Sequence, residues 1–194
     1  MSSNTTGPIA TAIGPVDIAL AGPADLDDVL DILNETARWL TSRGINQWVD
    51  GFPRKMIATD ISRGEVYLAR RELRAVGTFT LQWSDQLFWP GASGAAGYIH
   101  RIAVRREARG LGVELLKLAE RVTAASGRKS LRLDCFSGND ALCAYSSARG
   151  SCAAVISKST AAPIRRCPNP TGVFLRVSTR NRWPDWLFPK ILLG

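Results

Sequence analysis

The order of apolar and polar residues predicts an amphipathic helix near the start of the chain. Between residues 22 and 44, apolar side chains recur every three or four positions, the spacing of one helix face, at Leu26, Val29, Leu30, Leu33, Ala37 and Leu40. Asp25, Asp27 and Asp28 lie at its N-terminal end, where the helix dipole favours negative charge. Gly44 follows the last apolar position and can end the helix in a left-handed turn.

Shorter runs rich in β-branched and aromatic residues predict a sheet. We expect strands at residues 16–20, 65–71, 74–83, 98–104 and 130–136. Glu72 and Leu73 fall at a hairpin turn between the second and third of these strands. A second amphipathic helix is expected from about Arg109 to Gly127, and a third opens at Asn139, a good N-cap. The stretch between the first helix and the second strand stays open as helix or loop.

The resulting order of elements is that of an α/β domain. It runs strand, helix, helix or loop, three strands, helix, strand, helix, which predicts a mixed sheet with helices packed against it. A length of 194 residues suits one domain, and 45% apolar residues are enough to bury a core. Residues 1–15 are rich in Ser, Thr, Gly and Pro and are expected to form a flexible N-terminus. The domain is expected to occupy residues 16–150, followed by an atypical basic C-terminal segment at residues 151–194.

The sequence contains neither a targeting segment nor a metal-binding motif. The start, MSSNTTGPIATAIGP, lacks the basic region and apolar core of a signal peptide. No run approaches the roughly 18 apolar residues of a membrane span. The four cysteines form no C-x-x-C pair and the chain has one His, so no metal site is expected. These features predict a cytoplasmic protein with reduced thiols.

Nearly all of the net charge of +8 lies at the end of the chain. Residues 1–145 contain 17 Lys and Arg against 16 Asp and Glu, whereas residues 146–194 contain 8 Lys and Arg against one acid, Asp185. A basic face spread over the domain would indicate a nucleic-acid partner. Because the charge belongs to the tail, we do not expect nucleic acid as the main partner and keep a basic-tailed nucleic-acid binder as an alternative.

The segment IHRIAVRREARGLGVELLKLAE carries the candidate chemistry. A strand ends at Val104, a short basic connector follows, and a helix opens at RGLG. The first backbone N–H groups of a helix have no partner within it, and the dipole adds positive charge, so this position favours an anion. Gly110 and Gly112 allow a ligand to approach the backbone closely, and the arginines at 105, 106 and 109 add full charges. The pattern indicates a cradle for a pyrophosphate, with a helix start carrying incidental glycines as the plainer alternative.

This segment resembles the coenzyme A signature of the GCN5-related N-acetyltransferases, the GNAT family. The family pattern is commonly Arg-Gly-x-Gly-x-Gly/Ala, and the chain has RGLGVE, with Glu114 at the sixth position. A second family element is a strand followed by a helix that opens with Asn and carries a Tyr; LRLDC, Asn139 and Tyr145 correspond to it. The front segment ARWLTSRGINQW resembles an actinobacterial-type branch of the family. The resemblance extends from about Val16 to Tyr145.

The resemblance implies a fold and a set of site residues. The fold is the GNAT, or acyl-CoA N-acyltransferase, fold: a mixed, mostly antiparallel sheet flanked by helices. The backbone of Ile102, Ala103 and Val104 would pair with the pantetheine arm of acetyl-CoA, as an added strand does. Asn139 would contact the arm near the thiol, and Tyr145, the catalytic residue, would protonate the departing thiolate. Backbone amides would hold the pyrophosphate at Arg109, Gly110, Leu111, Gly112, Val113 and Glu114.

The implied reaction is direct attack by an amine on the acetyl thioester of acetyl-CoA, which serves as co-substrate without a metal. It requires orientation of two substrates, an oxyanion donor at the thioester carbonyl and an acid for the sulfur. The acceptor is an amine on a small molecule or peptide that the sequence does not identify, nor does the sequence give the oligomeric state. A coenzyme A-binding pseudoenzyme with impaired turnover is the first alternative.

The resemblance ends after Tyr145. The family's helix usually closes with Tyr-x-x-x-Gly-Phe, and counting back four residues from Gly150 gives Ser146, so Tyr145 is one position early. The stretch Ala141–Cys167 then loses periodicity, and the last strands of the fold are expected to be missing or altered. With GC-rich codons assumed from Ser146 onward, a shifted frame reads Gln-Arg-Ala-Gly and later Arg-Arg-Gly-Asp-Phe-Glu-Val. This favours the hypothesis of a single-base deletion at or near Ser146 over a diverged C-terminus.

Two further residue types are weighed for roles in the site. His100, the single His, precedes the cradle in the same strand and could accept a proton from the acceptor amine, although a satisfied sheet residue is the plainer interpretation. Core or loop anchoring is favoured for Trp39, Trp48, Trp83 and Trp89. Of these, Trp48 is the strongest candidate for an acceptor pocket, because it follows the first helix, where the family builds that site.

Overall fold

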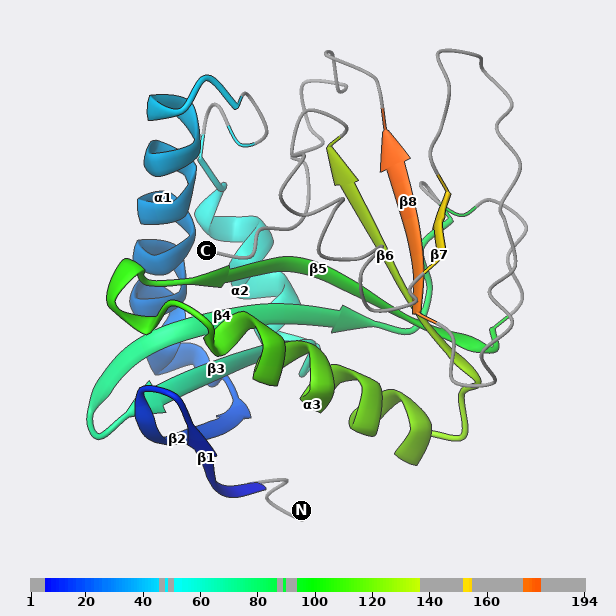
Figure 1. The fold of residues 1–194 in the computed structure, drawn as a ribbon, viewed down its shortest axis with the longest axis horizontal. Helices are drawn as coiled ribbons and strands as arrows, with labels where there is room; N and C mark the ends of the chain where they lie inside the picture. Colours follow the sequence, from blue (N-terminus) through cyan, green and yellow to red (C-terminus); the bar gives the residue numbers. More distant parts are fainter. Residues whose placement is uncertain are drawn as a thin grey trace.

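One sheet of eight strands organises the part of the chain that the structure describes (Figure 1). This computed structural model describes residues 6–45, 48, 51–86, 89, 94–136, 152–154 and 173–178. The strands are β1 (Thr6–Thr11), β2 (Gly14–Leu20), β3 (Val66–Arg71), β4 (Arg74–Gln82), β5 (Ala96–Val104), β6 (Ser130–Phe136), β7 (Cys152–Ala154) and β8 (Val173–Ser178). Their order across the sheet is β1-β2-β3-β4-β5-β6-β8-β7.

The direction of pairing changes at β5. Each pair from β1 to β5 is antiparallel, and the pairs beyond β5 are parallel. A parallel pair needs a crossover connection, and α3 (Leu111–Ala125) supplies the one between β5 and β6. The expected mixed, mostly antiparallel sheet with flanking helices is confirmed.

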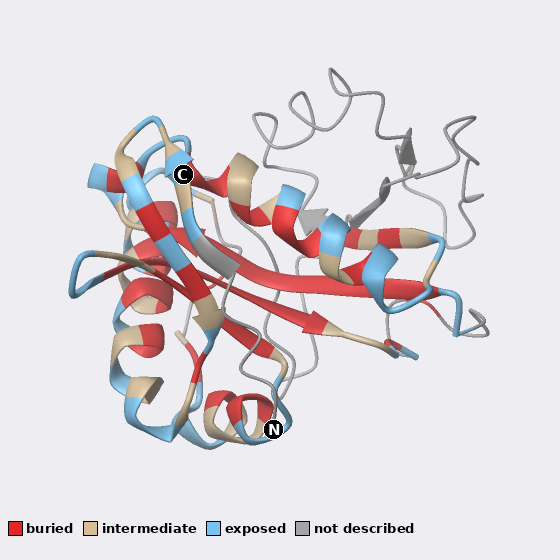
Figure 2. Ribbon diagram, turned by 90° about the horizontal axis from the view of Figure 1, so that it is seen from below, coloured by how far each residue is buried: buried red, intermediate tan, exposed pale blue. Residues whose placement is uncertain are grey.

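Helices cover both faces of the sheet. α1 (Leu26–Ser42) and α2 (Arg54–Ser62) lie on one face and α3 on the other (Figures 1 and 2). Short 3-10 helices precede α1 at Pro23–Asp25 and α3 at Arg106–Ala108. Each face buries its own apolar cluster: α3 packs on side chains that include Phe79, Ile99 and Ile102, and α1 and α2 enclose a second cluster that includes Leu33, Leu40 and Ile57.

The amphipathic pattern explains α1 and its end. The predicted apolar positions Val29, Leu30, Leu33, Ala37 and Leu40 are all buried. The helix stops at Ser42, and Gly44 follows with φ of 73°, the left-handed conformation predicted for it. α2 occupies the stretch that the sequence leaves open as helix or loop.

Both ends of the chain require a correction. Residues 6–11 were expected to belong to a flexible N-terminus, but they form β1, which pairs with β2 while Ile9 packs against the core. Part of the aperiodic tail also forms strands: β8 pairs with β6 along residues 131–136, and β7 pairs with β8. Both tail strands run parallel to their partners. The predicted helix at residues 139–150 lies outside the described residues.

A β-bulge interrupts the pairing of β4 with β5. Arg101 and Ile102 of β5 lie together opposite Phe79 of β4. The flanking pairs are Thr78 with Ala103 and Thr80 with His100. Arg101 has φ of 50°, in the left-handed region that residues other than glycine adopt at a cost of about 1–2 kcal/mol. The bulge therefore carries strain, because most bulges of this kind use glycine at that position.

β5 parts from β6 at the bulge. The two strands pair in parallel from Ala96 with Ser130 to Ile99 with Leu133, and among the described residues their pairing stops there. β6 then turns away from β5 and continues along β8 (Figure 1). The edge of β5 from residue 100 to residue 104 consequently has no strand beside it on the β6 side, within the part of the chain described.

Two glycines allow α3 to pack closely on the sheet. A Cβ atom on Gly77 would lie 3.1 Å from Cδ2 of Leu111, near the start of α3. A Cβ atom on Gly97 would lie 2.6 Å from Oγ1 of Thr123, near its end. Cβ atoms are essentially never found within 3.0 Å of another heavy atom, so the close approach at Gly97 requires glycine. The Thr123 hydroxyl is buried and has no hydrogen-bond partner among the described residues.

Gly97→Ala should lower the free energy of unfolding by about 1–3 kcal/mol, the usual cost of overpacking a core. Thr123→Ala removes the two nearest atoms that the new methyl group meets, Oγ1 and Cγ2, without breaking a hydrogen bond, and leaves only the contact with Trp83 at 3.2 Å among the three nearest. In the double variant, much of the loss caused by Gly97→Ala should therefore disappear. Urea unfolding of the four proteins gives the coupling energy. Purely additive effects would contradict a close contact between α3 and β5 at this point.

Candidate functional site

Gly110 lies at the start of α3 in a conformation that suits an anion cradle. Its φ is 94°, which favours glycine, and a Cβ atom there would meet no atom within 4 Å. The backbone therefore borders open space just where the first N–H groups of α3 lack partners within the helix. Gly112 is buried in the first turn. This arrangement favours binding of a negatively charged group such as a phosphate.

The three arginines of the connector have different roles. Arg105 faces inward: its Nε donates to the carbonyl oxygen of Ala75 at 2.9 Å, and its Nη1 forms an ion pair with Glu35 of α1 at 2.5 Å. The guanidinium of Arg106 lies 4.7 Å from the ring centre of Trp39, also on α1. Arg106 and Arg109 are exposed and supply positive charge beside Gly110. Arg105 instead ties the cradle to α1 and β4.

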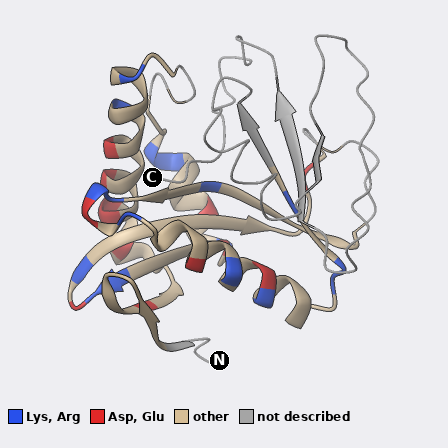
Figure 3. Ribbon diagram, viewed as in Figure 1, with Lys and Arg blue, Asp and Glu red and all other residues tan. Residues whose placement is uncertain are grey.

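Glu114, at the sixth position of the glycine pattern, lies in the first turn of α3. Its carboxylate accepts a hydrogen bond from Lys117 at 2.8 Å, one helical turn later. The acid therefore has a local partner, and its negative charge near the helix N-terminus is partly offset. Figure 3 shows the same mixture of acidic and basic residues along α3.

The open edge of β5 leads directly into this cradle. Ile102 and Val104 belong to the apolar cluster under α3, and Ala103 belongs to the cluster under α1 and α2. All three residues are buried and their side chains belong to the two core clusters, so a ligand that reaches this segment would meet its backbone, on the side from which β6 has turned away. Backbone N–H and C=O groups in such a position need a hydrogen-bond partner. An extended polar chain lying along β5 would supply one and would end at the first turn of α3.

His100 is a buried sheet residue. It is 1% exposed, and its Nε2 lies 3.6 Å from Oδ2 of Asp85, which is also buried. This environment agrees with the plainer interpretation of the sequence. A role as base stays a prediction.

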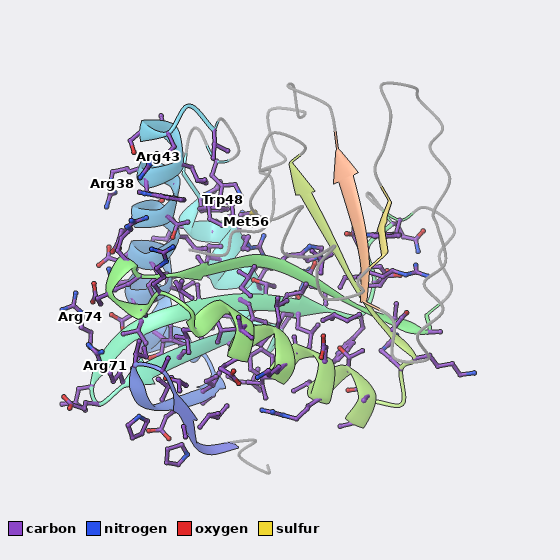
Figure 4. All side chains as sticks on the ribbon, in the orientation of Figure 1. Arg38, Arg43, Trp48, Met56, Arg71 and Arg74 are labelled. Carbon is purple, nitrogen blue, oxygen red and sulfur yellow. The ribbon has the colours of Figure 1, made fainter. Side chains whose placement is uncertain are left out.

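The four tryptophans in the described part of the chain anchor the core and its rim. Trp48 is fully buried and meets Phe52 edge-on at 4.9 Å, beside α1 and α2 (Figure 4). The burial of Trp48 agrees with the favoured interpretation of core anchoring, and a place for it in an acceptor pocket stays a prediction. Trp89 is buried next to Tyr98, and Arg132 stacks over both rings. Trp39 and Trp83 are partly buried beneath arginine side chains.

The two predicted residues closest to the chemistry lie outside the described residues. Asn139 and Tyr145 therefore remain predictions from the resemblance. A surface hollow of about 500 Å³ lies over α1 and shares no residue with the cradle; Asn34, Ala37, Arg38, Thr41, Ser42 and Gly51 line it. Among the described residues, no group of three or more His, Cys, Asp or Glu side chains could hold a metal ion, and no helix is long and apolar enough to cross a membrane.

Comparison with known proteins identifies the family. The model of the Acetyltransferase (GNAT) family matches residues 27–150, which include β5, the cradle and α3. The chain is 30% identical over 128 residues to the uncharacterized N-acetyltransferase YesJ of Bacillus subtilis (strain 168), which covers 61% of this chain and 71% of that protein. This chain belongs to the GNAT family and is an acetyltransferase.

Solved structures show the same fold. A GNAT-family acetyltransferase from Listeria monocytogenes 4b F2365 superposes with a TM-score of 0.64 at 27% identity, covering 76% of this chain and 90% of that one. PaiA N-acetyltransferase from Thermoplasma acidophilum, solved in complex with coenzyme A, superposes with a TM-score of 0.58 at 16% identity, covering 70% and 88%. The expected GNAT fold is confirmed.

The link between Arg105 and Glu35 should stabilise the protein measurably. A double-mutant cycle with Arg105→Gln and Glu35→Gln is expected to give a coupling energy of about 1–2 kcal/mol, because the pair is charge-assisted and mostly shielded from water. The matched control is the exposed pair Arg74–Glu107, for which the same substitutions should give about 0–0.5 kcal/mol. Equal coupling energies in the two cycles would show that Arg105 does not fasten the cradle to α1.

Proposed function

We propose that this acetyltransferase transfers the acetyl group of acetyl-CoA to an amine of a small molecule or peptide. The observation that carries the proposal is the continuous path from the open edge of β5 to the left-handed Gly110 at the start of α3. A long polar chain that ends in a pyrophosphate has the shape and chemistry to occupy that path. The coenzyme bound to the Thermoplasma relative supports this choice of donor.

The residues present fit the coenzyme. The backbone of Ile102, Ala103 and Val104 would hydrogen-bond the pantetheine arm, since their side chains are committed to the two core clusters. The amides from Arg109 to Glu114 would hold the pyrophosphate, aided by the exposed charge of Arg106 and Arg109. Arg105 would orient the connector without touching the ligand, because α1 and β4 already engage its guanidinium.

Acetyl-CoA, when bound, would supply the reactive acetyl thioester. Asn139 would hold the coenzyme arm near the sulfur, and Tyr145 would deliver a proton to the departing thiolate. Both assignments rest on the family resemblance and on the position of these residues after β6. The chain would exclude water and orient the two substrates, which is the larger part of catalysis in a direct transfer. A cytoplasmic location also stays a prediction.

Release of free thiol tests the proposal. The purified chain is incubated with acetyl-CoA and a panel of amines that includes polyamines, amino acids, aminoglycosides and peptide N-termini, and thiol is measured against a reaction without acceptor. Acceptor-dependent release with a matching acetylated product supports the transferase. Coenzyme binding by calorimetry without turnover on any amine would instead favour the pseudoenzyme, and absence of coenzyme binding would overturn the proposal.

Gly110→Ala should weaken coenzyme A binding by about tenfold or more, because the left-handed backbone that aims the first amides of α3 becomes costly. The matched control is Gly127→Ala at the other end of the same helix. Gly127 also has positive φ, 71°, and its Cβ would likewise meet no atom within 4 Å. Both variants should lose about 1–2 kcal/mol of stability. Equal loss of coenzyme affinity in both would place the pyrophosphate elsewhere.

We also propose that residues 151–194 form an atypical basic segment that follows a change of reading frame at or near Ser146. The tail holds nearly all of the net charge, and the family match ends at Gly150. The actinobacterial-type branch is proposed on the segment ARWLTSRGINQW. Sequencing the gene across the codons for Asn139 to Ala161 tests the change of frame. A missing base would support it, and an intact frame would show that the tail is a diverged but genuine C-terminus.

Ser146→Tyr restores tyrosine four residues before Gly150, the family position for the thiolate acid. If that register governs proton delivery, the substitution should raise kcat by about 10²-fold, the low end for a positioned acid. Ser146→Phe is the control, since it adds the ring without the hydroxyl. An equal effect of both substitutions would show that packing, not proton transfer, is involved.

A further inference from the structure

Arg101 places a buried positive charge at the point where β5 leaves β6. The residue is 5% exposed and forms an ion pair with Asp60 of α2, which is 6% exposed. Its Nε and Nη2 also donate to Oγ1 of Thr80 on β4, at 3.3 and 3.2 Å. Its Nη1 lies 3.8 Å from the sulfur of Met56, which projects from α2 on the same face of the sheet (Figure 4). One side chain thus joins α2, β4 and β5.

The environment of Arg101 raises the free energy of the folded state in two ways. Burial lowers the pKa of its guanidinium, and the neighbouring carboxylates of Asp60 and Glu65 act in the opposite direction. Its backbone also adopts a left-handed conformation, which glycine would adopt freely. A buried ion pair is weak evidence for added stability, because desolvation offsets much of the attraction. Strain of this kind persists where the surrounding structure imposes it, and it gathers at functional sites.

The location of the pair shows what it controls. The left-handed residue is the first of the two bulged residues of β5, and the pairing of β5 with β6 ends at Ile99, two positions earlier. The second bulged residue is Ile102, and Ala103 and Val104 follow it along the edge of β5 that β6 has left. A bulge bends its strand and increases its twist, so its conformation sets the direction in which these three residues run.

We propose that Arg101 and Asp60 are positioning residues, which hold the bulge of β5 and thereby set the backbone that receives the pantetheine arm. The inference rests on the proposed function. The guanidinium is fixed from α2 by a carboxylate and from β4 by a hydroxyl, so the bulge cannot relax toward regular pairing without leaving a buried charge unpaired. The bulge is thus held from the face of the sheet that α1 and α2 cover, opposite to the face that carries α3 and the cradle.

The test compares two ligands that differ by the arm. Acetyl-CoA contacts both the cradle and the proposed β5 edge, whereas 3′-phospho-ADP, the coenzyme without its pantetheine arm, reaches the cradle alone. Asp60→Asn, which keeps the size of the side chain and removes its charge, should weaken acetyl-CoA binding about tenfold or more, because a shifted β5 backbone loses hydrogen bonds to the pantetheine arm. Affinity for 3′-phospho-ADP, measured by the same calorimetry, should change by less than about twofold.

A second variant tests the same inference if Asp60→Asn does not fold. Thr80→Val preserves shape but removes the hydroxyl oxygen that accepts two hydrogen bonds from Arg101. It should produce the same selective loss of acetyl-CoA affinity, at about threefold to tenfold. Hydrogen exchange gives a readout without ligand: in both variants the amides of residues 100–104 should exchange faster, while those of β3 remain protected.

Two controls separate positioning from stability and from charge. Ile57→Val removes a methyl group from the buried face of α2 and lowers stability while it leaves the ion pair of Arg101 with Asp60 and its hydrogen bonds to Thr80 in place. Asp27→Asn removes a carboxylate from an exposed ion pair with Arg54, the first residue of α2. Neither control should alter the ratio of the two affinities.

The outcomes distinguish this inference from the proposed function. If the unaltered protein fails to bind acetyl-CoA, the proposed function is overturned and the inference with it. If the unaltered protein binds acetyl-CoA but Asp60→Asn and Thr80→Val leave the affinity ratio unchanged, the inference alone is wrong. Parallel loss of both ligands would likewise overturn it, because a general loosening of the fold would then explain the effect.

Discussion

The parting of β5 from β6 is the constraint on which the candidate site depends. Along residues 96–99, β5 lies between two strands, and after Ile99 β4 is the one strand that pairs with it in the described part of the chain. Backbone groups on this edge have no strand partner among the described residues, and an extended ligand chain can supply one. Because the connector after Val104 is short, the same edge runs straight into the first turn of α3. A binding surface for an extended chain and a cradle for an anion therefore form one continuous feature.

The direction of α3 depends on close packing at both of its ends. Gly77 admits Leu111 near the start of the helix, and Gly97 admits Thr123 near its end. Two separate contacts with the sheet fix the tilt of the helix axis, whereas a single contact would allow it to pivot. The connector is held independently from the other side, through Arg105 and Glu35. The amides at the start of α3 consequently occupy a preorganised position before any ligand arrives.

Periodicity predicted the elements that have a single apolar face or a clear turn. The sequence located α1, the hairpin at Glu72, α3 and β6 within a few residues, and the RGLG segment led to the cradle. β1 was missed because residues 1–15 are rich in Ser, Thr, Gly and Pro, and α2 stayed undecided because Pro53 and scattered polar residues weaken its pattern. The bulge could not be foreseen, since arginine rarely adopts a left-handed backbone and its partner Asp60 is 41 residues away in sequence. The environment of Trp48 likewise depends on tertiary packing that no local pattern reveals.

The agreement between chain order and sheet order from β1 to β5 has a consequence for how the fold is reached. Each of these strands pairs with the strand that precedes it, so the entropy of loop closure is small at almost every step. The antiparallel half can grow strand by strand as the nascent chain lengthens. β6 must instead wait for the whole crossover through α3, a contact of longer range and slower formation. The opening between β5 and β6 is therefore completed only after both of its walls have been built from separate parts of the chain.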